Sequence, residues 1–138
     1  MSFWFIDASV LLSREDVDDD QHEAARKLLA GDATLTTLDL AYYEVGNAVL
    51  AWRDVQAAAR LRGLVAAIAT DGGLVRADET LIAHAVRVAD TEGLSVSDAG
   101  HVAGAASAGA QLVSCDLRDL VNRQLAVTPQ QAVQEFDV

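Results

Sequence analysis

Short apolar runs alternate with longer amphipathic segments along the chain. Runs of strand length cover residues 3–7, 34–38 and 111–115, with weaker candidates at 94–96 and 125–127. Helical spacing of apolar residues extends over residues 20–30, 40–52, 54–70, 79–92, 98–109 and 117–124. This alternation predicts an α/β fold with a central parallel sheet of four to five short strands.

The length and the apolar content indicate one compact domain. We expect a single domain over residues 1–138, in which the acidic segment "REDVDDD" at 14–20 forms a loop. Hydrophobic residues make up 51% of the sequence, but no apolar run approaches the roughly 18 residues of a membrane span. The single cysteine, Cys115, excludes an internal disulfide and suits a reducing compartment. With no basic region before the first apolar run, we expect a cytoplasmic protein that does not bind membranes.

The charge balance is strongly acidic. The sequence has 21 Asp and Glu against 10 Lys and Arg, a net charge of -11 with neutral histidines, and Lys27 is its only lysine. This composition shows no broad basic surface for RNA. It is typical of adaptation to high internal salt, where hydrated carboxylates keep a protein soluble and salt screens their repulsion. The other interpretation is an acidic protein without halophilic adaptation.

A carboxylate interrupts the first apolar run. In "FWFIDASVLL", residues 3–12, Asp7 has apolar neighbours on both sides, where an unpaired buried charge would be costly. Asp98 and Asp116 also close or follow strand-like segments, and ligands of parallel α/β sheets gather at the carboxyl ends of strands. Each has a structural explanation as well, because Asp98 and Asp119 suit the first turn of a helix and Asp116 suits an N-cap.

Glu44 lies in the helical segment "LDLAYYEVGNAVLAW", where no residue three or four positions away is basic. A glutamate on a solvated face often has such a partner, whereas this one shares its face with small and apolar side chains. A partly exposed helix edge is the alternative explanation. If Asp7, Glu44, Asp98 and Asp116 converge, their repulsion raises their pKa values or requires cations, for which Mg²⁺ or Mn²⁺ is suitable.

The order of these acids resembles that of the PIN-domain ribonucleases, in particular the VapC-type toxins of toxin-antitoxin pairs. The resemblance rests on "FIDASVLL", "LDLAYYEVGNAVL" and "LSVSDAGHVAGAASAGAQLVSCDLRDL". In that family an aspartate ends the first strand, a glutamate lies in the helix after the second strand, and an aspartate opens a later helix. A last aspartate follows the fourth strand in a Thr/Ser-x-Asp pattern. The matching residues are Asp7, Glu44, Asp98 and Asp116.

The resemblance implies roles for these and for neighbouring residues. The four matched acids are the expected catalytic residues and the ligands of one or two Mg²⁺ or Mn²⁺ ions. Ser9 falls where the family often has Asn or Ser near the metal, and Ser114 matches the Thr/Ser, so both are expected to orient carboxylates. Asp119 is either an additional acid or a helix-capping residue. Gly100 and His101 stand where the family commonly has larger apolar or aromatic residues, so the packing there is expected to differ.

The implied protein is a metal-dependent endoribonuclease toxin with a three-layer α/β/α fold, which hydrolyses RNA phosphodiester bonds. The resemblance also implies a homodimer that a cognate antitoxin neutralises. The helix pair of residues 40–70, with its many alanines, is a candidate groove for an apolar partner helix. Arg14, Arg53 and Arg118 adjoin the predicted ends of the acid-bearing elements and are candidates for RNA contact. The alternative is a PIN-like module that has lost cleavage and binds RNA or protein, against which the retention of all four acids argues.

Other phosphate and metal chemistries fit the residues less well. A receiver domain is expected to have a lysine at a late strand, whereas Lys27 lies in an early helix. A haloacid-dehalogenase-like phosphatase would need a second aspartate two residues after Asp7, where Ser9 stands. The sequence contains no GxxxxGK[ST] or GxSxG motif. Its three histidines and one cysteine have no zinc-site spacing, so we expect the histidines on helices or surfaces.

Overall fold

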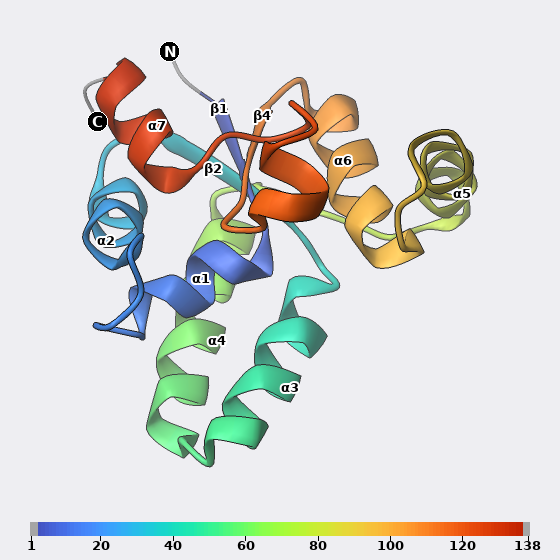
Figure 1. Cartoon of the computed structure of the whole chain (residues 1–138). Coiled ribbons are helices and arrows are strands. Elements are labelled where there is room, and N and C mark those ends of the chain that lie inside the picture. Colours follow the sequence, from blue (N-terminus) through green and yellow to red (C-terminus); the bar gives the residue numbers. More distant parts are fainter. Residues whose placement is uncertain (1–2, 137–138) are drawn as a thin grey trace.

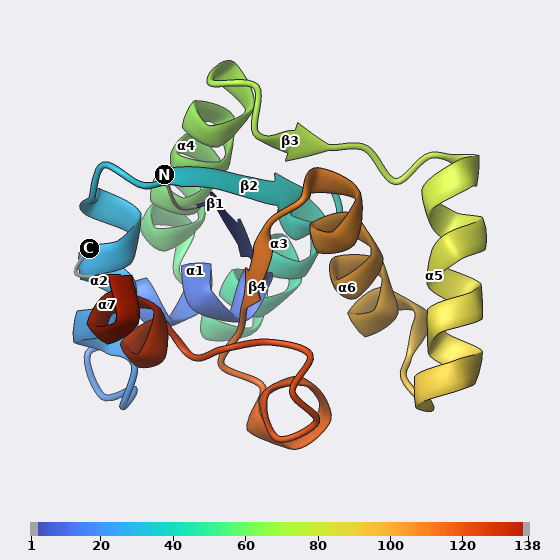
Figure 2. The same ribbon diagram turned by 90° about the horizontal axis from the view of Figure 1, so that it is seen from above.

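The computed structural model describes residues 3–136, so the first and last two residues of the domain expected over 1–138 lie outside the described range. Its strands form one parallel sheet in the order β3-β2-β1-β4 (Figures 1 and 2). The strands are β1 (Phe3–Ile6), β2 (Thr34–Leu38), β3 (Leu74–Val75) and β4 (Gln111–Val113). The predicted α/β fold with a central parallel sheet is therefore confirmed.

Helices cover both faces of this sheet and make three layers (Figure 2). One face carries α1 (Ala8–Arg14), α2 (His22–Ala30), α3 (Ala41–Trp52), α4 (Val55–Thr70) and α7 (Pro129–Phe136). The other face carries α5 (Glu79–Glu92), α6 (Val96–Ala108) and the π-helix η1 (Leu117–Val121). Successive residues of a strand point to opposite faces, so Trp4 and Ile6 enter the first core and Phe5 enters the second. None of the described helices is both long and apolar enough to span a membrane.

The predicted strand at 94–96 is wrong. Ser95 instead caps α6, because its hydroxyl accepts a hydrogen bond from the Asp98 backbone N–H at 3.1 Å. The additional strand is β3, whose two residues are too few to show an alternating pattern. The candidate strand at 125–127 is reduced to one bridge between Val113 and Val127.

Two helices were not predicted, and a third is shorter than expected. Helix α1 has seven residues, and its mostly apolar start, Ala8–Leu12, directly follows the apolar strand β1 and Asp7, which hides its periodicity. Helix α7 begins at Pro129, a residue that suits the first turn of a helix. The helix predicted over 117–124 is the five-residue π-helix η1. The remaining predicted helices and the loop at 14–20 are confirmed, with ends that differ by up to two residues.

Candidate active site

Asp7 follows β1 and caps α1, and the residue is 7% exposed. One oxygen, Oδ1, accepts a hydrogen bond from the Ser9 backbone N–H at 2.5 Å. The other, Oδ2, accepts one from the Ser114 hydroxyl at 2.6 Å. A buried carboxylate in apolar surroundings needs hydrogen-bond donors, and these two hydrogen bonds supply them.

The two serines tie the end of β1 to the end of β4, which the register places side by side. Ser9 Oγ accepts a hydrogen bond from the Cys115 backbone N–H at 2.9 Å, and Ser114 Oγ accepts one from the Asp116 backbone N–H at 3.0 Å. Their hydroxyl oxygens lie 3.4 Å apart. Ser114 thus contacts both Asp7 and the backbone of Asp116, which fixes the two acid-bearing chain segments relative to each other.

Cys115 lies within this network but is not set up as a nucleophile. Burial raises the pKa of its thiol to about 12, and the negative charges of Asp19 and Asp7 act in the same direction. The thiol therefore stays protonated at neutral pH, and reactivity requires the thiolate. Part of the side chain packs against the apolar core.

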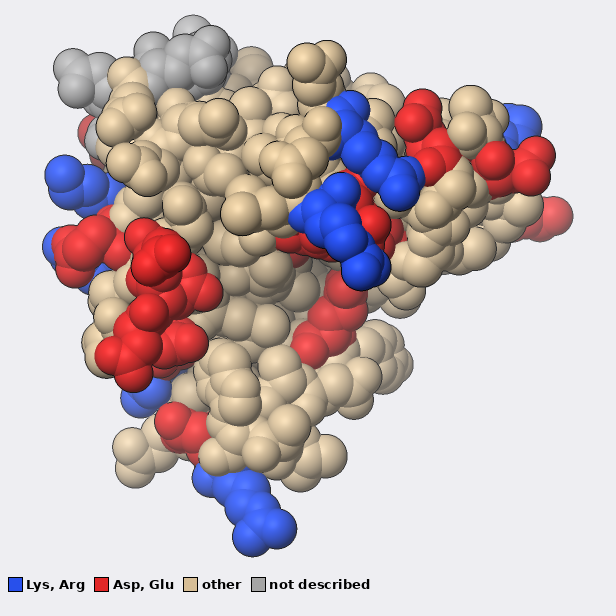
Figure 3. All heavy atoms as spheres, viewed as in Figure 1, with Lys and Arg blue, Asp and Glu red and all other residues tan. Residues whose placement is uncertain are grey.

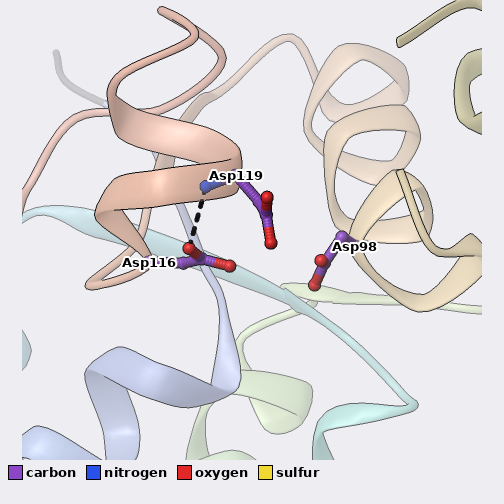
Figure 4. A group of neighbouring side chains, drawn as sticks. All are labelled: Asp98, Asp116 and Asp119. Atoms are coloured by element: carbon purple, nitrogen blue, oxygen red, sulfur yellow. Dashed lines mark hydrogen bonds between the residues drawn. The ribbon is translucent and has the colours of Figure 1, made fainter. Parts of the chain in front are cut away.

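Three carboxylates converge beside this network, and we call Asp98, Asp116 and Asp119 the acid cluster (Figure 4). One carboxylate oxygen from each lies within 4.8 Å of the others, and all three residues are half-buried. Asp98 lies in the first turn of α6, where the helix dipole favours negative charge. Asp116 caps η1 through a 3.0 Å hydrogen bond from the Asp119 backbone N–H, so Asp119 is not the cap.

The acid cluster has the electrostatics of a cation site. Burial raises the pKa of Asp98, and the charges of Asp116 and Asp7 raise it further, although a hydrogen bond with Ser95 opposes the shift. Clustered carboxylates repel one another unless a proton or a cation intervenes. Carboxylate oxygens are also the ligands that hard divalent ions prefer, so this donor set fits Mg²⁺ or Mn²⁺.

Glu44 does not lie in the acid cluster. Its side chain, on the first turn of α3, is 34% exposed, and its Oε1 is 2.7 Å from Nε2 of His101 on α6. His101 is 1% exposed. The absence of a basic neighbour along the Glu44 helix is thus explained by a partner 57 positions away. The sequence reasoning missed this contact, although His101 follows Asp98 by three residues and so shares its helix face.

Figure 3 shows acidic side chains at the centre of the face seen in Figure 1, where α6, η1 and α3 approach one another. Lys and Arg side chains lie across the upper part of this acidic strip. Arg118 and Arg123 both pair with Asp119, at 3.2 and 3.8 Å, and the Arg118 side chain is 89% exposed. Of the three arginines considered for RNA contact, Arg118 therefore lies beside the acids. Arg14 pairs with Glu15 at 3.1 Å instead.

Comparisons with known proteins agree on the fold. A toxin-antitoxin complex from Klebsiella pneumoniae contains a chain 16% identical, with a TM-score of 0.70, over 91% of this chain and 96% of that chain. PAE2754 from Pyrobaculum aerophilum is 24% identical, with a TM-score of 0.68, over 97% of this chain and 96% of that chain. VapC20 from Mycobacterium tuberculosis, described as a toxin that cleaves the sarcin-ricin loop, is 20% identical, with a TM-score of 0.62, over 80% and 86%.

The sequence itself matches one family model. No curated protein matches this sequence significantly. The model described as "PIN domain" matches residues 4–123, a span that contains every acid discussed above together with Ser9 and Ser114. The span includes β2, β3 and β4, all of β1 except Phe3, and both helices that carry Glu44 and Asp98. The chain belongs to the PIN-domain family.

Proposed function

We propose that this PIN domain is an Mg²⁺- or Mn²⁺-dependent endoribonuclease, the toxin of a VapBC-type toxin-antitoxin pair. The proposal rests above all on the acid cluster, in which carboxylate oxygens from Asp98, Asp116 and Asp119 lie within 4.8 Å of one another. Likeness to a chain of a Klebsiella toxin-antitoxin complex and to VapC20 supports the choice of RNA as substrate and of a toxin as biological role.

In the proposed site Asp7, Asp98 and Asp116 hold the metal, and Glu44 contributes directly or through water. Bound divalent ions supply positive charge to the phosphodiester oxygens and lower the pKa of the attacking water. Ser114 orients the Asp7 carboxylate and holds the Asp116 backbone, while the Asp119 backbone N–H orients the Asp116 carboxylate. Asp119, which the sequence left open as an additional acid or a helix-capping residue, adds a third carboxylate to the cluster.

The decisive experiment compares RNA cleavage by the purified wild-type protein with that of Asp7→Asn and Asp98→Asn, in Mg²⁺ or Mn²⁺ and in excess chelator. We expect cleavage only with metal and none by either variant, because each loses a carboxylate of the site. Asp90→Asn, which removes an exposed charge on α5, is the matched control. Cleavage by Asp7→Asn in excess chelator would rule out the proposal, and metal-independent RNA binding without cleavage would indicate an inactive binding module.

The proposed partners are RNA, a second copy of the chain and a cognate antitoxin, all in the cytoplasm. Apolar side chains of the α3–α4 hairpin are open to solvent: Tyr43, in the first turn of α3, and Leu50 are 76% exposed, and Val55 is 82% exposed. Such a group suits the apolar face of a partner helix. An arginine of the antitoxin would complement the acid cluster, because its planar guanidinium binds carboxylates in pairs.

A further inference from the structure

His101 is a buried polar residue whose contacts are few and directed. Nε2 lies 2.7 Å from Glu44 Oε1, and an ionised carboxylate only accepts, so Nε2–H donates. Nδ1 is buried and has no hydrogen-bond partner among residues 3–136. A buried polar atom without a partner costs free energy. An apolar side chain of similar size would avoid this cost, so packing alone does not account for a histidine here.

Its surroundings hold the imidazole in one orientation. The imidazole and the Phe5 ring make a T-shaped contact, with a centroid distance of 6.3 Å and an interplanar angle of 69°. Phe5 is itself fully buried against Gly104, where an added Cβ would lie 2.6 Å from the phenyl ring. The close approach of α6 to the sheet therefore fixes Phe5, and Phe5 limits the rotation of His101.

Only one carboxylate oxygen of Glu44 takes part in the hydrogen bond with His101. Oε1 accepts from His101, whereas Oε2 makes no hydrogen bond within the described part of the chain. Glu44 is on α3, while His101 is on α6, one turn after Asp98. The hydrogen bond thus ties the Glu44 side chain to the helix that carries an acid of the cluster.

We propose that His101 is a positioning residue of the active site, which holds Glu44 Oε1 so that Oε2 stays directed to the bound divalent ion or its water. The inference rests on the proposed function for the role of Glu44. Groups that hold a metal-binding carboxylate in this way commonly change metal affinity or activity by about 10- to 100-fold when removed. His101 acts through Glu44 and contacts neither metal nor RNA.

The test compares His101→Gln, which keeps an N–H donor near the position of Nε2, with His101→Met, which fills similar space without a donor. We expect His101→Met to weaken Mn²⁺ binding by about 10- to 100-fold in calorimetry and to lower kcat without changing KM for RNA. His101→Gln should remain within about threefold of wild type. His84→Met, on α5, controls for the loss of a histidine. If Mn²⁺ affinity and kcat of the two His101 variants equal those of wild type, His101 has no positioning role.

A second measurement needs no variant of His101. In wild-type protein with ¹⁵N-labelled histidine, Mg²⁺ should shift the His101 Nε2–H resonance, and Glu44→Ala should abolish that response. Mg²⁺-dependent amide shifts at Asp98, Asp116 and Asp119 with an unmoved His101 signal would overturn the inference and leave the proposed function intact. No response of any of these residues in wild type, together with metal-independent activity, would overturn both.

Discussion

At the scale of single residues, the protonation of Asp98 in the acid cluster makes the stability of the protein depend on pH. Burial and the charges of Asp116 and Asp7 raise its pKa in the folded chain above the ordinary value of 3.8. A raised pKa means that the folded state binds the proton more tightly than the unfolded state. The resulting contribution to stability is complete below the unfolded value and is lost as pH rises through the folded value.

We therefore expect Asp98→Asn, in excess chelator, to unfold at a higher temperature than wild type at neutral pH. This advantage should disappear as pH falls toward 3.8, because wild-type Asp98 is then protonated. Thermal unfolding followed by circular dichroism across this pH range measures the difference. Mg²⁺ should reverse the order at neutral pH, since it stabilises only the protein that binds it. A constant difference in unfolding temperature at every pH would show that the charged form of Asp98 does not destabilise the folded protein.

The positions of Asp7, Asp98 and Asp116 in the fold could be predicted from the sequence, because each lies where a strand ends or a helix begins. Such positions can be read from local apolar patterns. The contact between Glu44 and His101 could not, because it joins α3 and α6 across 57 positions. Whether Asp119 belonged to the site was also open, since its carboxylate meets those of Asp98 and Asp116 only after η1 has formed.

At the scale of helices and strands, the apolar pattern of the sequence predicted the long elements more reliably than the short ones. The 14 residues of α5 and the 16 of α4 show several turns of helical spacing, and their ends were predicted to within one residue. The two residues of β3 give no pattern, and its pairing with β2 comes from tertiary contacts. "LSVS" alternates like a strand, but the Ser95 cap determines its structure. The hydrogen bond between the Ser95 side chain and the backbone therefore outweighed the weak alternation of apolar and polar residues that is typical of a strand.

The packing of α6 on the sheet gives a second stability prediction. Gly104→Ala should destabilise the fold by about 1–3 kcal/mol, because the new methyl group overlaps the buried Phe5 ring. Gly63→Ala is the matched control, since no atom lies within 4 Å of its added Cβ in the exposed interior of α4. This control should stabilise by about 0.5–1 kcal/mol, because alanine is the better helix former. Urea denaturation measures both, and equal effects would contradict the close contact.

The exposed end of the α3–α4 hairpin gives a prediction about assembly. Leu50→Glu should weaken the complex with the co-expressed product of an adjacent antitoxin gene by about tenfold or more, because it places a charge in an apolar contact. Val86→Glu on α5, where valine is 50% exposed, is the control. Calorimetry gives the affinity, and light scattering gives the oligomeric state. A monomer at micromolar concentration that forms no complex would contradict both expected partners.

At the scale of the whole molecule, a net charge of -11 must be reconciled with the proposed binding to RNA, a polyanion. Repulsion between like-charged surfaces extends over about 8–10 Å at ordinary ionic strength, but over only about 3 Å at 1 M salt. A basic nuclease loses affinity with salt, because its binding draws on counterion release. Here the basic groups beside the acid cluster are Arg118 and Arg123, and both pair with Asp119. Binding should therefore depend mainly on metal bridges to phosphate and on these few arginines.

We expect folding stability and metal-dependent RNA cleavage to hold or increase from low salt to molar KCl. Salt screens the repulsion within the folded chain and between the chain and RNA, while contacts at short range in the acid cluster are screened less. Thermal unfolding and cleavage at constant Mg²⁺ over a KCl series test the two parts. Arg118→Ala should weaken RNA binding at every salt concentration, since its side chain is 89% exposed beside the acid cluster. A steep, steady loss of RNA binding with salt, at unchanged thermal stability, would instead indicate a basic RNA-binding surface and a protein not adapted to salt.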